Sequence, residues 1–321
     1  MNPGLPVEIG LLLYPGVLRS AVLGLTDLFE IGNRFVEPGS GGPIRVSHWQ
    51  QESAGAPIAR CFDTAPGLSG SPDMLVIPPS LEEPVPIATA ARFAEWLRQH
   101  HRAGGALASV CAGAFVLAES GLLDGRTVTT HWNYEELFQQ RFPKVSLDID
   151  RLIIDDGDIM TAGGVMAWTD LGLKLLDRFL GPGVMIKTAR TLLVDPPGRE
   201  QRYYSVFSPR LMHGDRAILK VQHWLQATEA QEIALDRLAD IAGLQARTFQ
   251  RRFQKATGMT TSEYCQRLRV GRAQDLLRFS RQSVESVAWD VGYKDPGAFR
   301  KIFVRVVGLS PGEYRVRFAP E

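Results

Sequence analysis

Cys111 and His131 are the residues whose types and spacing could carry covalent chemistry in this chain. Cys111 stands in the stretch ASVCAGAFVLAESG, between an apolar segment and one with helical character, and His131 follows in TVTTHW. A thiolate is a strong nucleophile, and a nearby imidazole can accept the thiol proton. The small residues Ala112 and Gly113 would permit the sharp strand-to-helix turn on which several α/β enzymes place a nucleophile.

Three interpretations of Cys111 are open at the level of the sequence. The start of a helix after Cys111 predicts a lowered thiol pKa and a site that favours anions. However, no Asp or Glu follows His131 before Glu135, and a Cys–His pair without an orienting acid is a weakened hydrolase. Cys111 is therefore a catalytic nucleophile, part of an effector pocket, or a structural residue. A redox role for Cys111 is compatible with the effector-pocket and the structural interpretations. Nothing in the sequence marks Cys61 as a redox partner.

Length and composition indicate a globular protein of two domains. At 321 residues the chain is long for one core, and 45% hydrophobic with 22% charged residues is an ordinary globular composition. No apolar run reaches the ~18 residues of a membrane span, and the start MNPGLPVEIGLLLYPG lacks the basic region of a signal peptide. Three widely spaced cysteines without a CxxC motif predict a reducing compartment and no metal. We therefore expect a cytoplasmic protein without metal, cofactor or membrane partner.

The net charge of +1 conceals two halves of opposite sign. From Asp236 to Glu321 there are 16 Lys and Arg against 9 Asp and Glu, a net of +7. The preceding residues carry 20 against 26, a net of −6. A basic segment is either a solvated surface or the binding site of a polyanion, which is most often a nucleic acid.

The first half of the chain alternates between short apolar strands and helices. Strands are predicted at Val7–Tyr14, Asp73–Pro79, 105–110 and 126–132, helices at 19–35, 86–101, 112–120, 134–142, 168–180 and 184–194, and a hairpin at 151–164 that turns at Asp156 and Gly157. Wholly apolar strands that alternate with helices are typical of a mostly parallel, doubly wound α/β sheet with both faces covered. We predict such a domain over residues 1–195.

The second half is predicted to be entirely helical. The stretch DPPGREQRYYSVFSPR breaks all periodicity with Pro, Gly and charged residues, so residues 196–215 are predicted as a linker. Beyond it, no strand pattern occurs. We predict an all-α domain over residues 216–321.

This helical half contains an internal repeat. Leu238–Tyr264 and Val287–Tyr314 share a pattern in which Phe, Phe, Gly and Tyr recur fifty residues apart, at 249 and 299, 253 and 303, 258 and 308, and 264 and 314. The four-residue spacing places each Phe pair on one helix face, and Gly243 and Gly292 stand where a helix must end and the chain reverse. A short helix, a glycine turn and a second helix with a basic outer face form a helix-turn-helix, here present twice.

The two halves resemble two known families. Residues from about 216 to 318 resemble the AraC/XylS-type DNA-binding domain, and SVAWDVGYKDPGAFRKIFVRVVGLSPGEYR is similar to the family signature across its whole length. The segment CAGAFVLAESGLLDGRTVTTHW resembles the class I glutamine amidotransferase-like (PfpI-type) domain, in the subgroup fused to AraC-type domains. The resemblance implies a flavodoxin-like fold for the first domain and tandem helix-turn-helix units for the second.

The resemblance implies a transcription regulator, more often an activator than a repressor. Its expected partners are double-stranded operator DNA, a small-molecule effector, a second copy of the chain and RNA polymerase. Relatives with enzymatic activity carry an acid just after the first strand, where this chain has Ser20 and Ala21. We therefore expect Cys111, Ala112 and His131 to form an effector pocket and no catalytic site. The alternative is a cysteine-dependent amidase or glyoxalase-like enzyme with an accessory basic domain.

Candidate DNA contacts follow from helix spacing and from the resemblance. In the first repeat the face opposite the phenylalanines carries Arg247, Gln250, Arg251 and Gln254. Arg can pair with guanine and Gln with adenine through two hydrogen bonds. In the second repeat, Pro296, Gly297 and Ala298 offer few hydrogen bonds, and the candidates are Arg300, Lys301 and Arg305. We expect direct base readout mainly from the first repeat, phosphate contacts from the second, and simple solvation of Arg252, Lys255, Arg267, Arg269 and Arg272.

Overall fold

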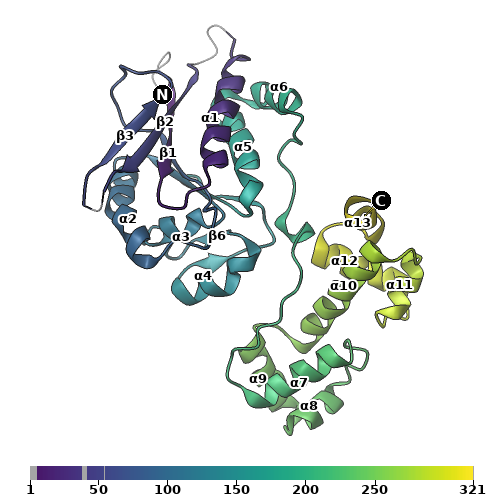
Figure 1. Ribbon diagram of the computed structural model, residues 1–321. Coiled ribbons are helices and arrows are strands. Elements are labelled where there is room, and N and C mark those ends of the chain that lie inside the picture. The colour runs from purple at the N-terminus through teal and green to yellow at the C-terminus, as the bar shows by residue number, and fades with distance from the viewer. Residues whose placement is uncertain (1–5, 38–41, 54, 321) are drawn as a thin grey trace. The chain divides into compact units, whose positions relative to one another are not determined.

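A seven-stranded sheet organises the first of the two units into which the chain folds (Figure 1). The structure, a computed structural model, describes residues 6–37, 42–53 and 55–320. The first unit is Met1–Gln201 and the second is Arg202–Glu321. Among the described residues, no helix has the length and apolar character needed to cross a membrane.

The sheet has the strand order β3-β2-β1-β4-β5-β9-β8. Its strands are β1 Val7–Leu13, β2 Ile44–Gln51, β3 Ile58–Asp63, β4 Met74–Ile77, β5 Ala106–Val110, β8 Ile153–Asp155 and β9 Ile159–Ala162. The five central strands are parallel, whereas the edge strands β3 and β8 are antiparallel to their neighbours. The predicted doubly wound, mostly parallel α/β fold is confirmed, as is the β8–β9 hairpin.

Alternating side chains of the strands form two cores, one on each face of the sheet. Ile9 and Leu11 of β1 pack into the first core, with α1 Arg19–Asn33, α5 Trp168–Leu180 and α6 Pro182–Leu192. Leu12 packs into the second core, which contains buried residues of α2 Ile87–Arg102, α3 Gly113–Ala118 and α4 Glu135–Arg141. Because successive strand residues point to opposite faces, one apolar run serves both cores.

Strands β2 and β3 were not anticipated from the sequence. Their sequences, IRVSHWQQ and IARCFD, contain charged residues that interrupt the apolar pattern. Arg45 on β2 is nevertheless buried, because its guanidinium pairs with Glu8 at 3.0 Å and also with Asp63. These partners lie far from Arg45 in the sequence, so local periodicity carries no sign of the pairing.

The predicted strand at 126–132 is much shorter in the structure. Only β6 Thr127–Val128 forms, and it pairs with β7 Ser146–Leu147 in a separate two-stranded sheet. The next two residues are held by side-chain hydrogen bonds instead. The backbone N–H of Thr129 donates to the Thr161 hydroxyl at 2.9 Å, and the Thr130 hydroxyl donates to the Cys111 carbonyl at 2.7 Å.

The second unit is helical and contains two cores, as the repeat predicts. Its helices are α7 Arg216–Ala227, α8 Leu235–Ala242, α9 Ala246–Thr257, α10 Thr261–Phe279, α11 Val284–Asp290, α12 Pro296–Val307 and α13 Pro311–Phe318. Phe249 and Phe253 are fully buried in the first core, and Phe299 and Phe303 in the second. Gly243 ends α8 in the left-handed conformation, with φ +65°, as expected.

Residues around the predicted linker are anchored within each unit. The Gln201 side-chain amide donates to the carbonyl oxygens of Ile149 at 2.9 Å and Thr130 at 3.0 Å, inside the first unit. In the second unit, the Phe207 ring contacts the Tyr264 ring edge-on, with centroids 5.2 Å apart. The linker boundaries of 196–215 stay a prediction.

Candidate functional site: a nucleic-acid face and an effector cavity

The chain turns sharply at Cys111, between β5 and α3. Cys111 has φ +53°, a left-handed backbone conformation that is uncommon for a residue with a side chain. Its N–H donates to the Ala162 carbonyl of β9 at 2.7 Å. A Cβ atom on Gly113 would lie 2.4 Å from the Ile77 carbonyl oxygen, so only glycine fits at the start of α3. The predicted elbow is therefore present.

The Cys111 thiol is in an environment that keeps it protonated. Its side chain is buried, with 1% of the residue exposed, and burial raises the pKa of the thiol to about 11. A backbone hydrogen bond with Ala112 lowers this pKa, but by less than burial raises it. The expectation that the helix start would lower the thiol pKa is wrong, because loss of hydration outweighs the backbone hydrogen bond with Ala112.

His131 is engaged away from the thiol. It precedes a 3₁₀ helix at Trp132–Tyr134, and its Nδ1 accepts a hydrogen bond from the Asn133 N–H at 3.1 Å. Burial lowers the pKa of the imidazole, which favours its neutral form. Within the described ranges no hydrogen bond joins His131 to Cys111. The two residues therefore do not form the thiol–imidazole pair that nucleophilic catalysis requires.

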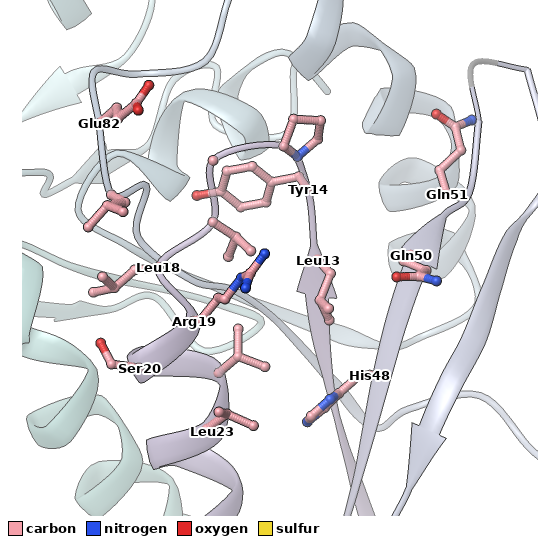
Figure 2. A pocket seen from close by; sticks show the side chains of 15 residues that line it. Leu13, Tyr14, Leu18, Arg19, Ser20, Leu23, His48, Gln50, Gln51 and Glu82 are labelled. Atoms are coloured by element: carbon pink, nitrogen blue, oxygen red, sulfur yellow. The ribbon is translucent and has the colours of Figure 1, made fainter.

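A cavity of about 970 Å³ opens at the carboxyl ends of β1 and β2, above the start of α1 (Figure 2). It is lined by Leu13, Tyr14, Pro15, Gly16, Val17, Leu18, Arg19, Ser20, Val22, Leu23, His48, Gln50, Gln51, Leu81 and Glu82. None of the predicted pocket residues Cys111, Ala112 and His131 belongs to this lining. No sequence pattern marked it, because α1, β2 and the loop after β4 contribute separately.

Tyr14 links this cavity to the elbow. The Tyr14 side chain lines the cavity, and its hydroxyl donates to the Pro78 carbonyl at 2.6 Å. Burial raises the pKa of the phenol, and the neighbouring Cys111 raises it further. Tyr14 is thus near both the thiol and the cavity.

The outer face of α9 presents four unpartnered polar side chains. Arg247, Gln250, Arg251 and Gln254 are all exposed, and in the described part of the chain none of their side chains makes a hydrogen bond or ion pair. The structure thus brings these four residues together on one face, opposite the buried phenylalanines. The residue before α9, Gln245, provides no side-chain cap, so the first N–H groups of the helix are available to an anion.

The corresponding face of α12 is partly neutralised. Arg300 forms an ion pair with Glu285, and Arg305 donates to the Gln266 side chain at 2.5 Å. Lys301 is exposed, and no partner for it exists among the residues described. Asp295 caps α12 by accepting hydrogen bonds from the Gly297 and Ala298 N–H groups. An acidic cap and a paired arginine make α12 a weaker anion site than α9.

Arg269 is a buried structural residue, so its expected solvation is wrong. Only 8% of it is exposed, and its guanidinium donates to the carbonyls of Ala230 at 2.7 Å, Gln231 at 3.2 Å and Gly292 at 3.1 Å. Ala230 follows α7, next to the first helix-turn-helix, and Gly292 is the turn of the second. One side chain on α10 therefore binds loops of both helix-turn-helix motifs to the same helix.

Two other arginines expected to be solvated also form ion pairs. Arg252 pairs with Asp215 at 2.7 Å, which lowers the pKa of that carboxyl, and Arg272 pairs with Glu229. Asp215 also caps α7 by accepting from the Ile218 N–H. These arginines are thus engaged within the helical unit.

Comparison with known proteins identifies both halves. Residues 238–317 match the family model described as a helix-turn-helix domain, and residues 64–178 match the DJ-1/PfpI family. The chain is 27% identical to the HTH-type transcriptional regulator CdhR of Pseudomonas aeruginosa over 314 residues, which cover 95% of this chain and 90% of that protein. It is 28% identical to the HTH-type transcriptional regulator GlxA of Rhizobium meliloti, over 73% of this chain and 72% of that protein. It is 33% identical to the HTH-type transcriptional activator RhaS of Enterobacter sp., over 33% of this chain and 38% of that protein.

The burial of Cys111 predicts low reactivity towards alkylating agents. A thiol with a pKa of about 11 is ionised to less than about one part in a thousand at pH 7.5. In the folded chain iodoacetamide should therefore modify the exposed Cys61 and leave Cys111 and the buried Cys265 intact, as measured by mass spectrometry of peptides. Unfolding in guanidinium chloride should expose all three. Alkylation of Cys111 as fast as Cys61 would contradict the protonated, buried thiol.

The free face of α9 predicts that Arg251 contributes to base readout. The substitution Arg251→Ala should weaken binding to a DNA duplex selected by the wild-type chain by ~1–3 kcal/mol and relax preference at one base pair. Fluorescence anisotropy on selected and random duplexes measures both effects. The control is Lys220→Ala on α7, which should change little. An equal loss on both duplexes would instead make Arg251 a phosphate contact.

The clamp by Arg269 predicts a large effect on the stability of the helical unit. Arg269→Met leaves three backbone carbonyls without their donor, which costs about 2 kcal/mol or more of unfolding free energy. The stability of Arg269→Lys should lie between those of the wild type and Arg269→Met, since an ammonium cannot reach both loops as a guanidinium does. Calorimetry of the full chain measures the transition, with the exposed Arg281→Met as control. Equal transitions for Arg269→Met and Arg281→Met would refute the clamp.

Proposed function

We propose that a small effector bound in the α/β unit controls binding to operator DNA, because the chain combines a match to the DJ-1/PfpI family with a match to a helix-turn-helix domain and is similar to HTH-type transcriptional regulators. DNA binding is assigned to α9 and α12. The α/β unit is assigned the sensing of the effector. The chain is a regulator and not an enzyme.

The observation that carries the DNA-binding role is the unpartnered outer face of α9. Arg247, Gln250, Arg251 and Gln254 have the donors and acceptors that base edges in the major groove require. Because these side chains have no partner among the residues that the structure describes, DNA contact would break none of the described interactions. Arg300, Lys301 and Arg305 on α12 are proposed to contact phosphates, and Arg300 must leave Glu285 to do so.

The effector role rests on an elbow that is retained without a reactive thiol. The acid position is occupied by the exposed Ser20 and the fully buried Ala21, and the Cys111 thiol is protonated. Open α/β sheets bind ligands at the carboxyl ends of their strands, and Cys111 and Ala112 directly follow β5. The hydrogen bond from the Thr130 hydroxyl to the Cys111 carbonyl holds the residue before His131 next to the same strand end. We place the effector site at this edge of the sheet.

Further parts of the proposal come from the relatives. RhaS of Enterobacter sp. is an activator by name, and we propose activation here, with RNA polymerase as a partner. We also propose a homodimer in the cytoplasm and a linker at residues 196–215 between the two domains.

The proposal is tested with the full chain on DNA. A duplex selected from a random library should bind at least about a thousandfold more tightly than random sequence, and both affinities should fall linearly with the logarithm of salt concentration. A metabolite that raises the melting temperature of the chain should change the affinity for the selected duplex. Cys111→Ser, which removes the thiol, should retain this response.

Two results would contradict the proposal. Failure to bind any duplex even in 50 mM salt would remove the DNA-binding role. Loss of the response in Cys111→Ser, while the variant still binds both metabolite and DNA, would show that thiol chemistry is required.

A further inference from the structure

Arg19 is a free cation in the cavity at the carboxyl ends of β1 and β2. It is the first residue of α1, it is exposed, and its side chain lines the cavity. Figure 2 shows it extending from the first turn of α1 towards the loop that follows β1. Within residues 6–37, 42–53 and 55–320 its guanidinium has no carboxylate or hydrogen-bond partner.

The start of α1 adds further donors at the same point. Leu18 precedes the helix and provides no side-chain cap, and the first turn contains no acidic residue. The N–H groups of Arg19 and Ser20 therefore have no acceptor among the described atoms, and the Ser20 hydroxyl lines the same cavity. A guanidinium, a hydroxyl and helix-start N–H groups together match one carboxylate.

His48 supplies the independent observation that the cavity is built for a ligand. It is 6% exposed, and its ring lines the cavity. The Thr26 hydroxyl lies 2.9 Å from both the Val22 carbonyl and His48 Nε2, and the tautomer with Nε2 as the donor satisfies both contacts. Burial lowers the pKa of this imidazole and keeps it neutral. Nδ1 is then a bare acceptor with no protein donor in the described structure.

Apolar side chains lie between these polar groups. Leu13, Leu18 and Leu23 line the cavity, and Leu23 is 60% exposed although it is a large hydrophobic residue. Glu82, exposed on the loop after β4, is the single carboxylate among the described residues that line the cavity. With one cation and one anion, the lining accommodates a ligand with one negative charge better than a dianionic phosphate.

From these contacts we propose that the cavity binds a small carboxylate with an apolar body and one adjacent hydrogen-bond donor. Arg19, Ser20 and the start of α1 hold the carboxylate, Leu13, Leu18 and Leu23 contact the body, and His48 Nδ1 accepts from the donor. The donor is a hydroxyl or an ammonium group, and Glu82 favours the latter. This site deepens the proposed function, since it names the chemical class of the effector.

Four matched probes test the site on the full chain by calorimetric titration. They are 2-hydroxy-4-methylpentanoate, L-leucine, 4-methylpentanoate, which lacks the donor, and 4-methylpentane-1,2-diol, which lacks the carboxylate. The hydroxy acid or leucine should bind most tightly, and the comparison of these two identifies the donor. The other two should bind at least about tenfold more weakly.

Arg19→Gln should weaken binding of the best probe by about tenfold or more, because it removes the charged partner of the carboxylate. The position is exposed, so the substitution should leave the fold intact. The control is Arg34→Gln at the other end of α1, outside the cavity, which should bind as the wild type does. The site is refuted if no probe binds, if the diol binds as tightly as the acids, or if Arg19→Gln binds normally.

Operator affinity separates this site from the proposed function. A probe that binds through Arg19 but leaves DNA affinity unchanged supports the site and contradicts the effector role. A different metabolite that changes DNA affinity equally in wild type and Arg19→Gln supports the effector role and contradicts the assignment of the effector to this site.

Discussion

The helical unit depends on α10, a single helix that belongs to two cores. Tyr264 and Cys265 near its start are buried with the first helix-turn-helix, and Val270, Ala273 and Leu277 are buried with the second. Arg269 lies between these groups and binds carbonyls of loops from both. The proposed contacts of α9 and α12 with adjacent stretches of one groove require a fixed separation of the two helices, and α10 with Arg269 provides that constraint. The backbone next to this contact is strained. Ala230, whose carbonyl accepts from Arg269, has a left-handed φ of +53° without being glycine.

The α/β unit retains the backbone turn that presents a nucleophile, but the Cys111 thiol on this turn is not reactive. The turn at Cys111 has the strained backbone and the glycine at Gly113 that such an elbow requires. What differs is the surrounding charge and hydration, since the thiol is buried and protonated, and Ser20 and Ala21 stand where the resemblance places an acid. The polar groups without a described partner lie farther along the sheet, around Arg19 after β1 and His48 on β2, with β4 between these strands and β5. The carboxyl edge of the sheet therefore retains a concave site whose free groups suit binding rather than proton transfer.

The elbow is also connected to the end of the first unit by hydrogen bonds. Thr130 donates its hydroxyl to the Cys111 carbonyl, and its own carbonyl accepts from the Gln201 amide. Gln201 in turn accepts from the Trp132 N–H at 2.8 Å and is 2% exposed. Gln201 is the last residue of the unit. The last residue of the α/β unit is thus buried, and its side-chain amide binds Thr130 next to the Cys111 turn.

Local sequence alone determined the repeat, the buried faces of α9 and α12, the αL glycine at 243 and the sharp turn at Cys111. These features depend on spacings of a few residues, and an apolar period or a small side chain records them directly. Tertiary structure decided the rest. Arg45 is buried because Glu8 and Asp63 meet it, Arg269 because two loops converge on it, and Arg300 is neutralised by Glu285. The cavity around Arg19 and the raised pKa of Cys111 likewise arise from segments that only folding brings together, and charge pairing and loss of hydration leave no periodic mark in a sequence.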